Sequence, residues 1–252
     1  MPMPNSNLAG DAATMSTDRS ERFETAVNKI HYKLKQFAGK EGAFVELLRE
    51  LRPRYAVIRN YYEDLKAFAR LRNAIVHEKW APGRYIAEPH ADVVERIELI
   101  CNKMYHPPGV MDIATRKVVV FDAADPLENV MEEISVSRYS QFPVYRSGKF
   151  ACLLTADGII QWIYAQSRKP DWSISEARVE HIIEFETGRN YLFVSRQMNV
   201  FEIEDLFEEH LARGSKIEAV IVTENGDAAD KPIGVVTPWD LIKINPPDSF
   251  LF

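Results

Sequence analysis

A threonine and an aspartate, three residues apart, follow a short β-branched run late in the sequence. Residues 234–241 read GVVTPWDL, so a strand that stops at Thr237 and turns into a helix leaves a hydroxyl and the Asp240 carboxylate about one helical turn apart. Both groups would lie beside the unpaired N–H groups of a helix N-terminus, which also favours phosphate. We therefore treat Gly234, Thr237, Pro238 and Asp240 as candidate nucleotide-binding residues. Capping of the helix is the alternative role for this threonine and aspartate.

An arginine, an asparagine and a histidine form a second polar group, in the string LRNAIVHEKW of residues 71–80. Asn73 and His77 are four residues apart on a predicted helix, so they share a face that the long side chain of Arg72 can also reach. Histidine transfers protons at neutral pH, and a guanidinium binds phosphate oxygens. These residues could act on a phosphodiester, or they could only bond to the loop that follows the helix.

The composition is that of a globular protein without a general attraction for nucleic acid. The 252 residues are 46% hydrophobic and 27% charged, with a formal net charge of -6. A polyanion site would therefore need a local basic patch, and we expect neither DNA nor a membrane among the partners. Apolar runs stay shorter than the roughly 18 residues that a spanning helix requires. Residues 1–18 lack the basic and apolar regions of a signal peptide and predict a disordered leader and a cytoplasmic location.

Cysteine and histidine usage gives no sign of a metal site or a disulfide. Cys101 and Cys152 each lie in an apolar stretch, which favours two reduced core thiols. The six histidines have no metal-ligand spacing. We expect no metal and no cofactor for catalysis.

Residues 19–108 have the periodicity of α-helices. Apolar residues at spacings of three and four mark four helices, around residues 23–37, 44–51, 55–77 and 93–104. Short breaks with proline or glycine separate them, so this part predicts an α-helical bundle.

After residue 108, short β-branched runs alternate with helices, and the order recurs. Leu127, Val130 and Ile134 map onto Val200, Ile203 and Phe207 at a constant offset of 73 residues. Thr155 recurs as Thr237 at an offset of 82, because the second hairpin carries a longer loop. The predicted fold class is α+β, with an N-terminal α-helical bundle followed by two β-α-β-β-α repeats at residues 111–170 and 171–252.

The two repeats resemble a tandem pair of CBS domains over residues 111–245. The resemblance rests on SQFPVYRSGKFACLLT in the first copy and AVIVTENGDAADKPIGVVTPWDLI in the second. Gly234, Thr237 and Asp240 fit the G-x-x-T-x-x-D pattern of the family, whose threonine and aspartate hold a ribose. The resemblance implies two clefts that bind an adenine nucleotide such as AMP, ADP or ATP.

The first copy departs from the pattern. Cys152 replaces the glycine, Gly158 stands at the position of the aspartate, and Asp157 comes one residue early. A shift of one residue rotates a side chain by about 100° around a helix, so Asp157 should not repeat the contact of Asp240. We expect one competent cleft around Thr237 and Asp240 and one weak or empty cleft around Thr155 and Asp157.

The string at residues 71–80 resembles the R-N-x-x-x-H signature of the HEPN family, whose helical bundle would cover residues 19–108. The resemblance implies a metal-independent endoribonuclease with His77 as general base and Arg72 stabilising the phosphorane. Asn73 would orient His77 or the phosphate. Because one copy supplies few groups, it also implies a symmetric homodimer. HEPN-like bundles without activity form the alternative.

Three functions remain open. The first is a sensor in which the CBS pair binds an adenine nucleotide and modulates a dimeric helical effector bundle. The second is a nucleotide-regulated ribonuclease that acts on RNA through the bundle. The third is a structural dimer with vestigial clefts. Arg138 and Arg196 lie near strand ends that would line a cleft, although the abundance of arginine favours a solvated surface position for each. Lys66, Lys79 and Arg84 could supply contacts to RNA phosphates in the bundle.

Overall fold

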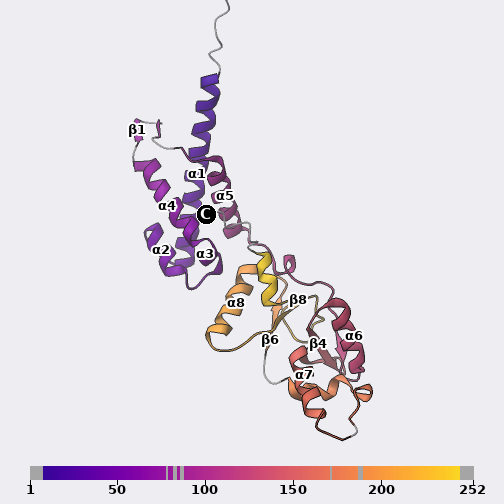
Figure 1. Ribbon diagram of the computed structural model, residues 1–252. Coiled ribbons are helices and arrows are strands. Elements are labelled where there is room, and N and C mark those ends of the chain that lie inside the picture. Colours follow the sequence, from indigo (N-terminus) through magenta and orange to yellow (C-terminus); the bar gives the residue numbers. More distant parts are fainter. Residues whose placement is uncertain are drawn as a thin grey trace, which may run out of the picture. The chain divides into compact units, whose positions relative to one another are not determined.

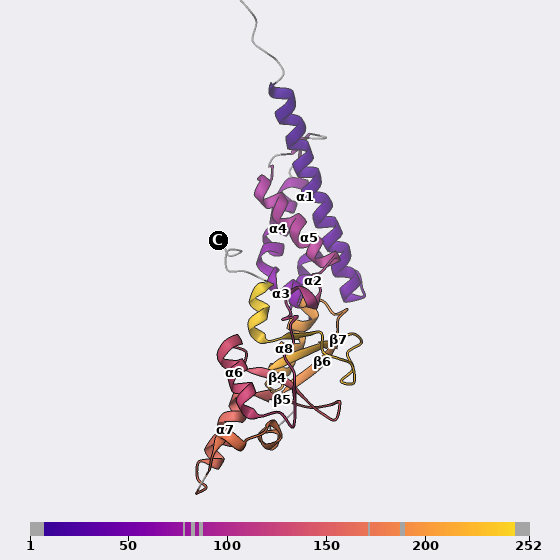
Figure 2. The ribbon, with the colours of Figure 1, turned by 90° about the vertical axis from the view of Figure 1, so that its right-hand side faces the viewer.

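The computed structural model describes residues 8–77, 79–81, 84–85, 88–170, 172–186 and 190–244 (Figures 1 and 2). The chain divides into two compact units, Met1–Pro108 and Gly109–Phe252. The first unit consists mainly of helices, and the second contains two small sheets with helices packed against them. The α+β fold class is therefore confirmed. Along the described helices, no stretch combines the length and the apolar character that crossing a bilayer requires.

The first unit is built from the helices that the apolar spacing predicts. Its elements are α1 (Leu8–Ala38), α2 (Phe44–Leu51), α3 (Ala56–Asn60), α4 (Tyr62–His77), β1 (Lys79–Ala81), β2 (Arg84–Tyr85) and α5 (Ala91–Tyr105). Helices α1, α4 and α5 lie side by side in both views (Figures 1 and 2). The third predicted helix is divided into α3 and α4 at Tyr61. The predicted apolar stripes form the core, since Phe23, Ile30, Leu65 and Ile97 are buried.

The predicted disordered leader is corrected in part. Helix α1 begins at Leu8, so residues 8–18 are helical rather than disordered. This stretch contains no proline and several alanines, which have the highest helix propensity. Residues 1–7 lie outside the described part of the chain.

The first repeat of the second unit forms a three-stranded sheet. Its elements are β3 (Phe121–Asp122), α6 (Leu127–Ser137), β4 (Gln141–Arg146), β5 (Lys149–Thr155) and α7 (Ala156–Gln166). Strand β3 pairs parallel to β4 through the crossover helix α6, and β4 pairs antiparallel to β5. The hairpin turns at Ser147 and Gly148, which both have positive φ. In both views α6 and α7 lie beside these strands (Figures 1 and 2).

The second repeat has the same topology, so the internal repeat is confirmed. Its elements are β6 (Tyr191–Ser195), α8 (Val200–Ala212), β7 (Ala219–Thr223), β8 (Gly234–Val236) and η5 (Pro238–Lys243). Strand β6 pairs parallel to β7, and β7 pairs antiparallel to β8. The final element differs from expectation, because the described residues form a six-residue 3₁₀ helix rather than an α-helix.

The leading segment of each repeat packs against the other repeat. Residues 109–119, the first exchanged segment, contain η1 (Val110–Asp112) and pair with β8, because Thr115 and Val235 exchange N–H···O bonds of 2.9 and 3.1 Å. Residues 172–186, the second exchanged segment, contain η2 (Ile174–Glu176), η3 (Val179–His181) and η4 (Ile183–Phe185).

The second exchanged segment belongs to the core of the first repeat. The N–H of Leu127 donates to Ala177 O at 2.9 Å, and Val179 and Ile182 are buried in the same cluster as Val130. The boundary between the two packed repeats therefore does not follow the order of the chain. A division between residues 170 and 171 separates the second exchanged segment from the repeat whose core it completes.

Candidate functional site

Thr237 and Asp240 meet at the corner where β8 passes into η5. Thr237 is the N-cap residue, and its N–H and Oγ1 donate to Asp240 Oδ2 at 2.8 and 2.9 Å. Lys243 Nζ donates to Asp240 Oδ1 at 2.7 Å and to Ile113 O at 2.8 Å. The structure thus brings together the hydroxyl and the carboxylate that the spacing places at one helix corner.

Gly234 and Pro238 flank this corner. A Cβ at Gly234 would lie 3.0 Å from the Cβ of Ala114 and 3.4 Å from the side chain of Met111, so a glycine permits the close approach of the first exchanged segment. Pro238 is the first residue of η5, where its missing N–H leaves no helix bond unmade. Both residues shape the backbone around Thr237.

A narrow hollow of about 40 Å³ lies beside Thr237, and we call it the second cleft. It is lined by three segments: Val235 and Thr237, residues 115 and 117–119 of the first exchanged segment, and residues 139 and 141–143 at the start of β4. Lys117 is the charged side chain in this lining, and Tyr139 is 42% exposed at its side. The second cleft is therefore small and locally basic.

The equivalent corner in the first repeat obtains its carboxylate from a different place. Thr155 is the N-cap residue of α7, and its Oγ1 accepts from the N–H of Gly158 at 3.0 Å. The N–H of Thr155 donates to Glu186 Oε1 at 2.6 Å, and its Oγ1 donates to the same oxygen at 3.1 Å. Glu186 follows η4 in the second exchanged segment. It makes to Thr155 the two hydrogen bonds that Asp240 makes to Thr237.

Gly158 explains how Glu186 reaches this position. A Cβ at Gly158 would lie 2.1 Å from Glu186 Oε1 and 2.7 Å from its Cδ, so any side chain there would occupy the place of the carboxylate. Gly158, which stands where the motif requires aspartate, thus leaves the space that the Glu186 carboxylate occupies in place of that aspartate. Sequence reasoning missed Glu186, although the glycine in the first helical turn was a visible signal.

A larger hollow of about 350 Å³ surrounds Thr155, and we call it the first cleft. It is lined by Thr155, Asp157, Gly158, Gln161, Phe185, Glu186, Asn190, Ser215, Lys216 and Glu218. Lys216 Nζ is paired with Glu218 Oε1 at 2.5 Å. With the carboxylates ionised, three negative side chains oppose one ammonium group, so the first cleft is acidic.

Burial dominates the electrostatics of Glu186. Loss of solvent raises the pKa of its carboxyl group above the usual value, and the nearby Asp157 and Glu218 raise it further, while the hydrogen bonds from Thr155 act in the opposite direction. Burial also raises the pKa of the Cys152 thiol to about 12. Cys152 is therefore an inert core thiol, and both it and Cys101 are free and buried, as predicted.

The two clefts follow one plan with the repeats exchanged. The first cleft joins the helix corner of the first repeat, at Thr155, to residues 215–218 before β7 of the second. The second cleft joins the corner at Thr237 to residues 139–143 around the start of β4. Each cleft therefore needs both repeats.

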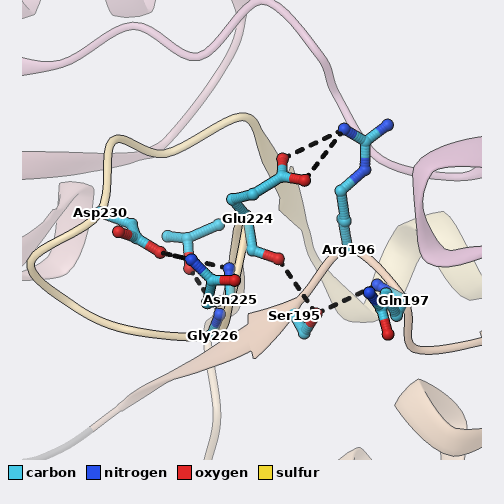
Figure 3. Close-up of polar contacts among 8 residues, drawn as sticks. Ser195, Arg196, Gln197, Glu224, Asn225, Gly226 and Asp230 are labelled. Atoms are coloured by element: carbon cyan, nitrogen blue, oxygen red, sulfur yellow. Dashed lines mark hydrogen bonds and ion pairs between the residues drawn. The ribbon is translucent and has the colours of Figure 1, made fainter.

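Arg196 does not reach the corner at Thr237. It lies after β6, where its Nη1 pairs with Glu224 Oε2 at 3.1 Å, in a network that includes Ser195 (Figure 3). Ser195 pairs with Thr223 at the end of β7, whereas Val236, the residue before Thr237, pairs with Val220 near the start of β7. Arg196 and Thr237 therefore lie toward opposite ends of this sheet. Arg196 is thus an exposed residue paired with Glu224, which agrees with the solvated-surface interpretation and not with a phosphate contact at this corner. Arg138 is exposed and caps α6 in the left-handed conformation, directly before Tyr139.

The polar group of the helical unit is described only in part. Arg72 and Asn73 lie in the last part of α4 and line a hollow of about 320 Å³ together with Asn28 and His31 of α1. His31 Nε2 lies 2.9 Å from Gly42 O. Sequence reasoning did not place His31 near this group, because the two come together only through helix packing.

Three predicted side chains of this unit fall outside the described ones. Helix α4 ends at His77, whose side chain lies outside the described residues, as do those of Lys79 and Arg84. Lys66 is paired with Glu63 at 3.1 Å. Within the described ranges, no group of three or more histidine, cysteine, aspartate or glutamate residues could hold a metal ion.

Comparison with known proteins identifies the second unit. Residues 110–165 and 179–246 match the family model of the CBS domain. A solved structure of a signal-transduction protein with CBS domains from Burkholderia ambifaria is similar to the chain with 19% identity and a TM-score of 0.43, covering 57% of this chain and 98% of that one. No curated protein matches the chain.

Two further solved structures contain bound ligands. The CBS domain of a bacterial CNNM/CorC family Mg²⁺ transporter in complex with ATP is 21% identical, covers 54% of this chain and 85% of its own, and has a TM-score of 0.39. A CBS domain pair in complex with 5′-methylthioadenosine and S-adenosyl-L-methionine is 17% identical, covers 55% and 95%, and has a TM-score of 0.40.

Proposed function

The second unit carries a tandem pair of CBS domains, and we propose that this pair senses an adenine nucleotide and thereby regulates the helical unit. One observation carries the proposal. In both repeats a threonine at a helix N-terminus holds a carboxylate through its N–H and its hydroxyl, beside a cleft that both repeats line. A hydroxyl and a carboxylate at such a corner suit the hydroxyl groups of a ribose.

We assign the nucleotide itself to the second cleft. Thr237 and Asp240 would hold the ribose, with the backbone shaped by Gly234 and Pro238. Lys117 supplies a positive charge for the phosphate groups. The hollow of about 40 Å³ is smaller than the usual ligand pocket, so the ligand must displace the half-exposed Tyr139.

Regulation requires that the ligand favour one arrangement of the helical unit over another. We propose that the helical unit forms a homodimer and that nucleotide binding shifts the equilibrium between two arrangements of this dimer. The two units follow each other directly in the chain at residues 108 and 109, so the link between them is short. We expect the protein to act in the cytoplasm, where adenine nucleotides are abundant.

The test is a titration of the full chain with AMP, ADP and ATP, by calorimetry and by thermal unfolding. A ligand at a hundred times its Kd adds about 2.7 kcal/mol to the free energy of unfolding. Thr237→Val should weaken nucleotide binding about tenfold, because it removes one hydrogen bond of the corner. Ser195→Ala, in the loop network of Figure 3, is the control and should bind as the wild type does. The proposal is contradicted if none of these nucleotides gives a heat of binding or raises the melting temperature.

A second candidate function is cleavage of RNA by the helical unit. Arg72 and Asn73 line a hollow of about 320 Å³ in this unit, where they and two polar residues of α1 lie among apolar side chains. His77 would act as general base and Arg72 would stabilise the phosphorane, without a metal. RNA cleavage by the wild type that is lost in His77→Ala and Arg72→Ala, and kept in the control Arg70→Ala, would establish it. If neither cleavage nor nucleotide binding is found, the structural dimer with vestigial clefts is the surviving alternative.

A further inference from the structure

The first cleft holds a carboxylate that the CBS motif does not supply. Glu186 Oε1 accepts from both the N–H and the Oγ1 of Thr155, at 2.6 and 3.1 Å, whereas its Oε2 lies 3.3 Å from the same hydroxyl. A carboxylate oxygen accepts about two hydrogen bonds, so Oε2 keeps capacity for a donor from a ligand. The expectation of a weak or empty first cleft assumed that no carboxylate reaches Thr155, and Glu186 removes that assumption.

The charge of the first cleft decides between ligand classes. Glu186, Asp157 and Glu218 all line it, and the single ammonium group of this lining, that of Lys216, is already paired with Glu218. A phosphate monoester carries a charge of about −1.5 to −2 near neutral pH. Placed here it would meet like charges in a partly buried site, which costs free energy. The ribose hydroxyls of a nucleoside would meet acceptors instead.

The size and the remaining lining fit a nucleoside. The volume of about 350 Å³ lies in the range of small-molecule pockets. The side-chain amides of Gln161 and Asn190 provide donors and acceptors for the edge of a base, and Phe185 provides an aromatic ring. These groups come from α7, from the second exchanged segment and from the residue before β6.

We infer that the first cleft binds a nucleoside without phosphate groups, and that Glu186 sets this selectivity by replacing the aspartate of the motif. The inference rests on the proposed function, in that it takes the clefts of the pair to bind adenine ligands. It adds a second ligand class and a residue that the motif does not contain. The chain would then distinguish adenosine-type ligands from adenine nucleotides by the cleft they enter.

The experiment uses the full chain with Thr237→Val, which weakens the second cleft, and measures binding of adenosine and AMP by calorimetry near neutral pH. Adenosine should bind at least about tenfold more tightly than AMP, since one repelled phosphate is worth more than about 1.4 kcal/mol in such a site. Adding Glu186→Gln keeps an acceptor for Thr155 and removes the charge, so the preference should fall to about threefold or less. Glu184→Gln, an exposed change in the same segment, should leave it unchanged.

Two results would overturn the inference. AMP binding as tightly as adenosine in Thr237→Val contradicts the selectivity, and an unchanged preference in Glu186→Gln contradicts the role of Glu186. Should Glu186→Gln fail to fold, Glu218→Gln tests the same charge argument, because it removes one carboxylate and frees Lys216. It should raise the affinity for AMP at least about threefold.

Thr155→Val separates this inference from the proposed function. It removes the hydroxyl of the first cleft and should weaken adenosine binding about tenfold, while AMP and ATP still bind at the second cleft. If neither this variant nor the wild type binds AMP, ADP or ATP, the proposed function alone is refuted. Absence of adenosine binding in Thr237→Val would refute the inference alone.

Discussion

The first cleft takes its carboxylate from the segment that precedes the other repeat, whereas the second takes it from the same helical turn as its threonine. In both clefts the threonine nonetheless donates from its N–H and its hydroxyl to a single carboxylate oxygen. The surroundings differ, because the first cleft is wide and acidic and the second is narrow and contains Lys117. A duplicated unit can therefore keep one bonding pattern while the source of the group, and with it the charge of the site, changes. A sequence motif shows only which nearby residue supplies the carboxylate, whereas the hydrogen bonds are seen only in the structure.

Gly158→Asp is the most severe way to break this comparison, since it restores the motif in the first repeat. A Cβ there would lie 2.1 Å from Glu186 Oε1, so the Glu186 carboxylate must move away from Thr155. We expect a loss of about 2 kcal/mol in the free energy of unfolding, from its lost hydrogen bonds and from like charge. Urea unfolding of the wild type and the variant measures it. Adding Glu186→Ala should recover most of the loss, because the introduced carboxylate could then accept from Thr155. An equal loss with and without Glu186 would show that the two positions do not compete.

Lys117→Ala sharpens the comparison at the second cleft. This change removes the positive charge of the lining, so AMP should bind about fivefold more weakly and adenosine should be little affected. Calorimetry in the Thr155→Val background isolates the second cleft. Lys216→Ala, the matching change in the first cleft, should leave AMP binding at the second cleft unchanged, because Lys216 does not line that cleft. A similar loss for AMP and adenosine would mean that Lys117 supports the fold of the cleft rather than the phosphate.

The pH dependence of stability gives the smallest effect. The pKa of Glu186 is raised, mainly by burial, so the folded chain retains a proton on this group at pH values where the unfolded chain has lost it. Its contribution to stability is therefore complete below the usual glutamate pKa of about 4.3 and is lost as the pH rises through the raised value. Asp157, Glu218 and Lys216 are the other charged side chains that line the same cleft.

Glu186→Gln lacks this titration. Its stability relative to the wild type should rise as the pH increases from about 4 toward neutrality. Thermal unfolding across that range measures the difference, and Glu184→Gln controls for the loss of one negative charge on the same segment. A constant difference between Glu186→Gln and the wild type over this range would contradict the assignment.

Much of the fold follows from local sequence patterns. The apolar stripes through Phe23 and Ile97 predict helices because burial and helical period coincide there, and the constant offset between Leu127 and Val200 predicts the repeat. The corner at Thr237 and Asp240 is also local, since both residues lie within one turn. Such features need no knowledge of distant contacts.

The rest depends on contacts between distant residues. Glu186 lies 31 residues after Thr155 and reaches it only because residues 172–186 cover the first sheet. Which end of the sheet Arg196 occupies depends on strand direction, which proximity in sequence does not give. The helical start at Leu8 was missed because residues 1–18 were compared with a signal peptide and not examined for helix propensity.

The exchange of leading segments has a consequence for how the CBS pair folds. Residues 109–119 complete the second sheet and residues 172–186 complete the core of the first, so neither repeat is whole without chain from beyond its own sheet. In this respect the pair is equivalent to a domain-swapped dimer whose two subunits have been fused into one chain. Such a module should unfold in a single cooperative transition rather than as two independent domains. A change that destabilises either sheet should therefore destabilise both clefts.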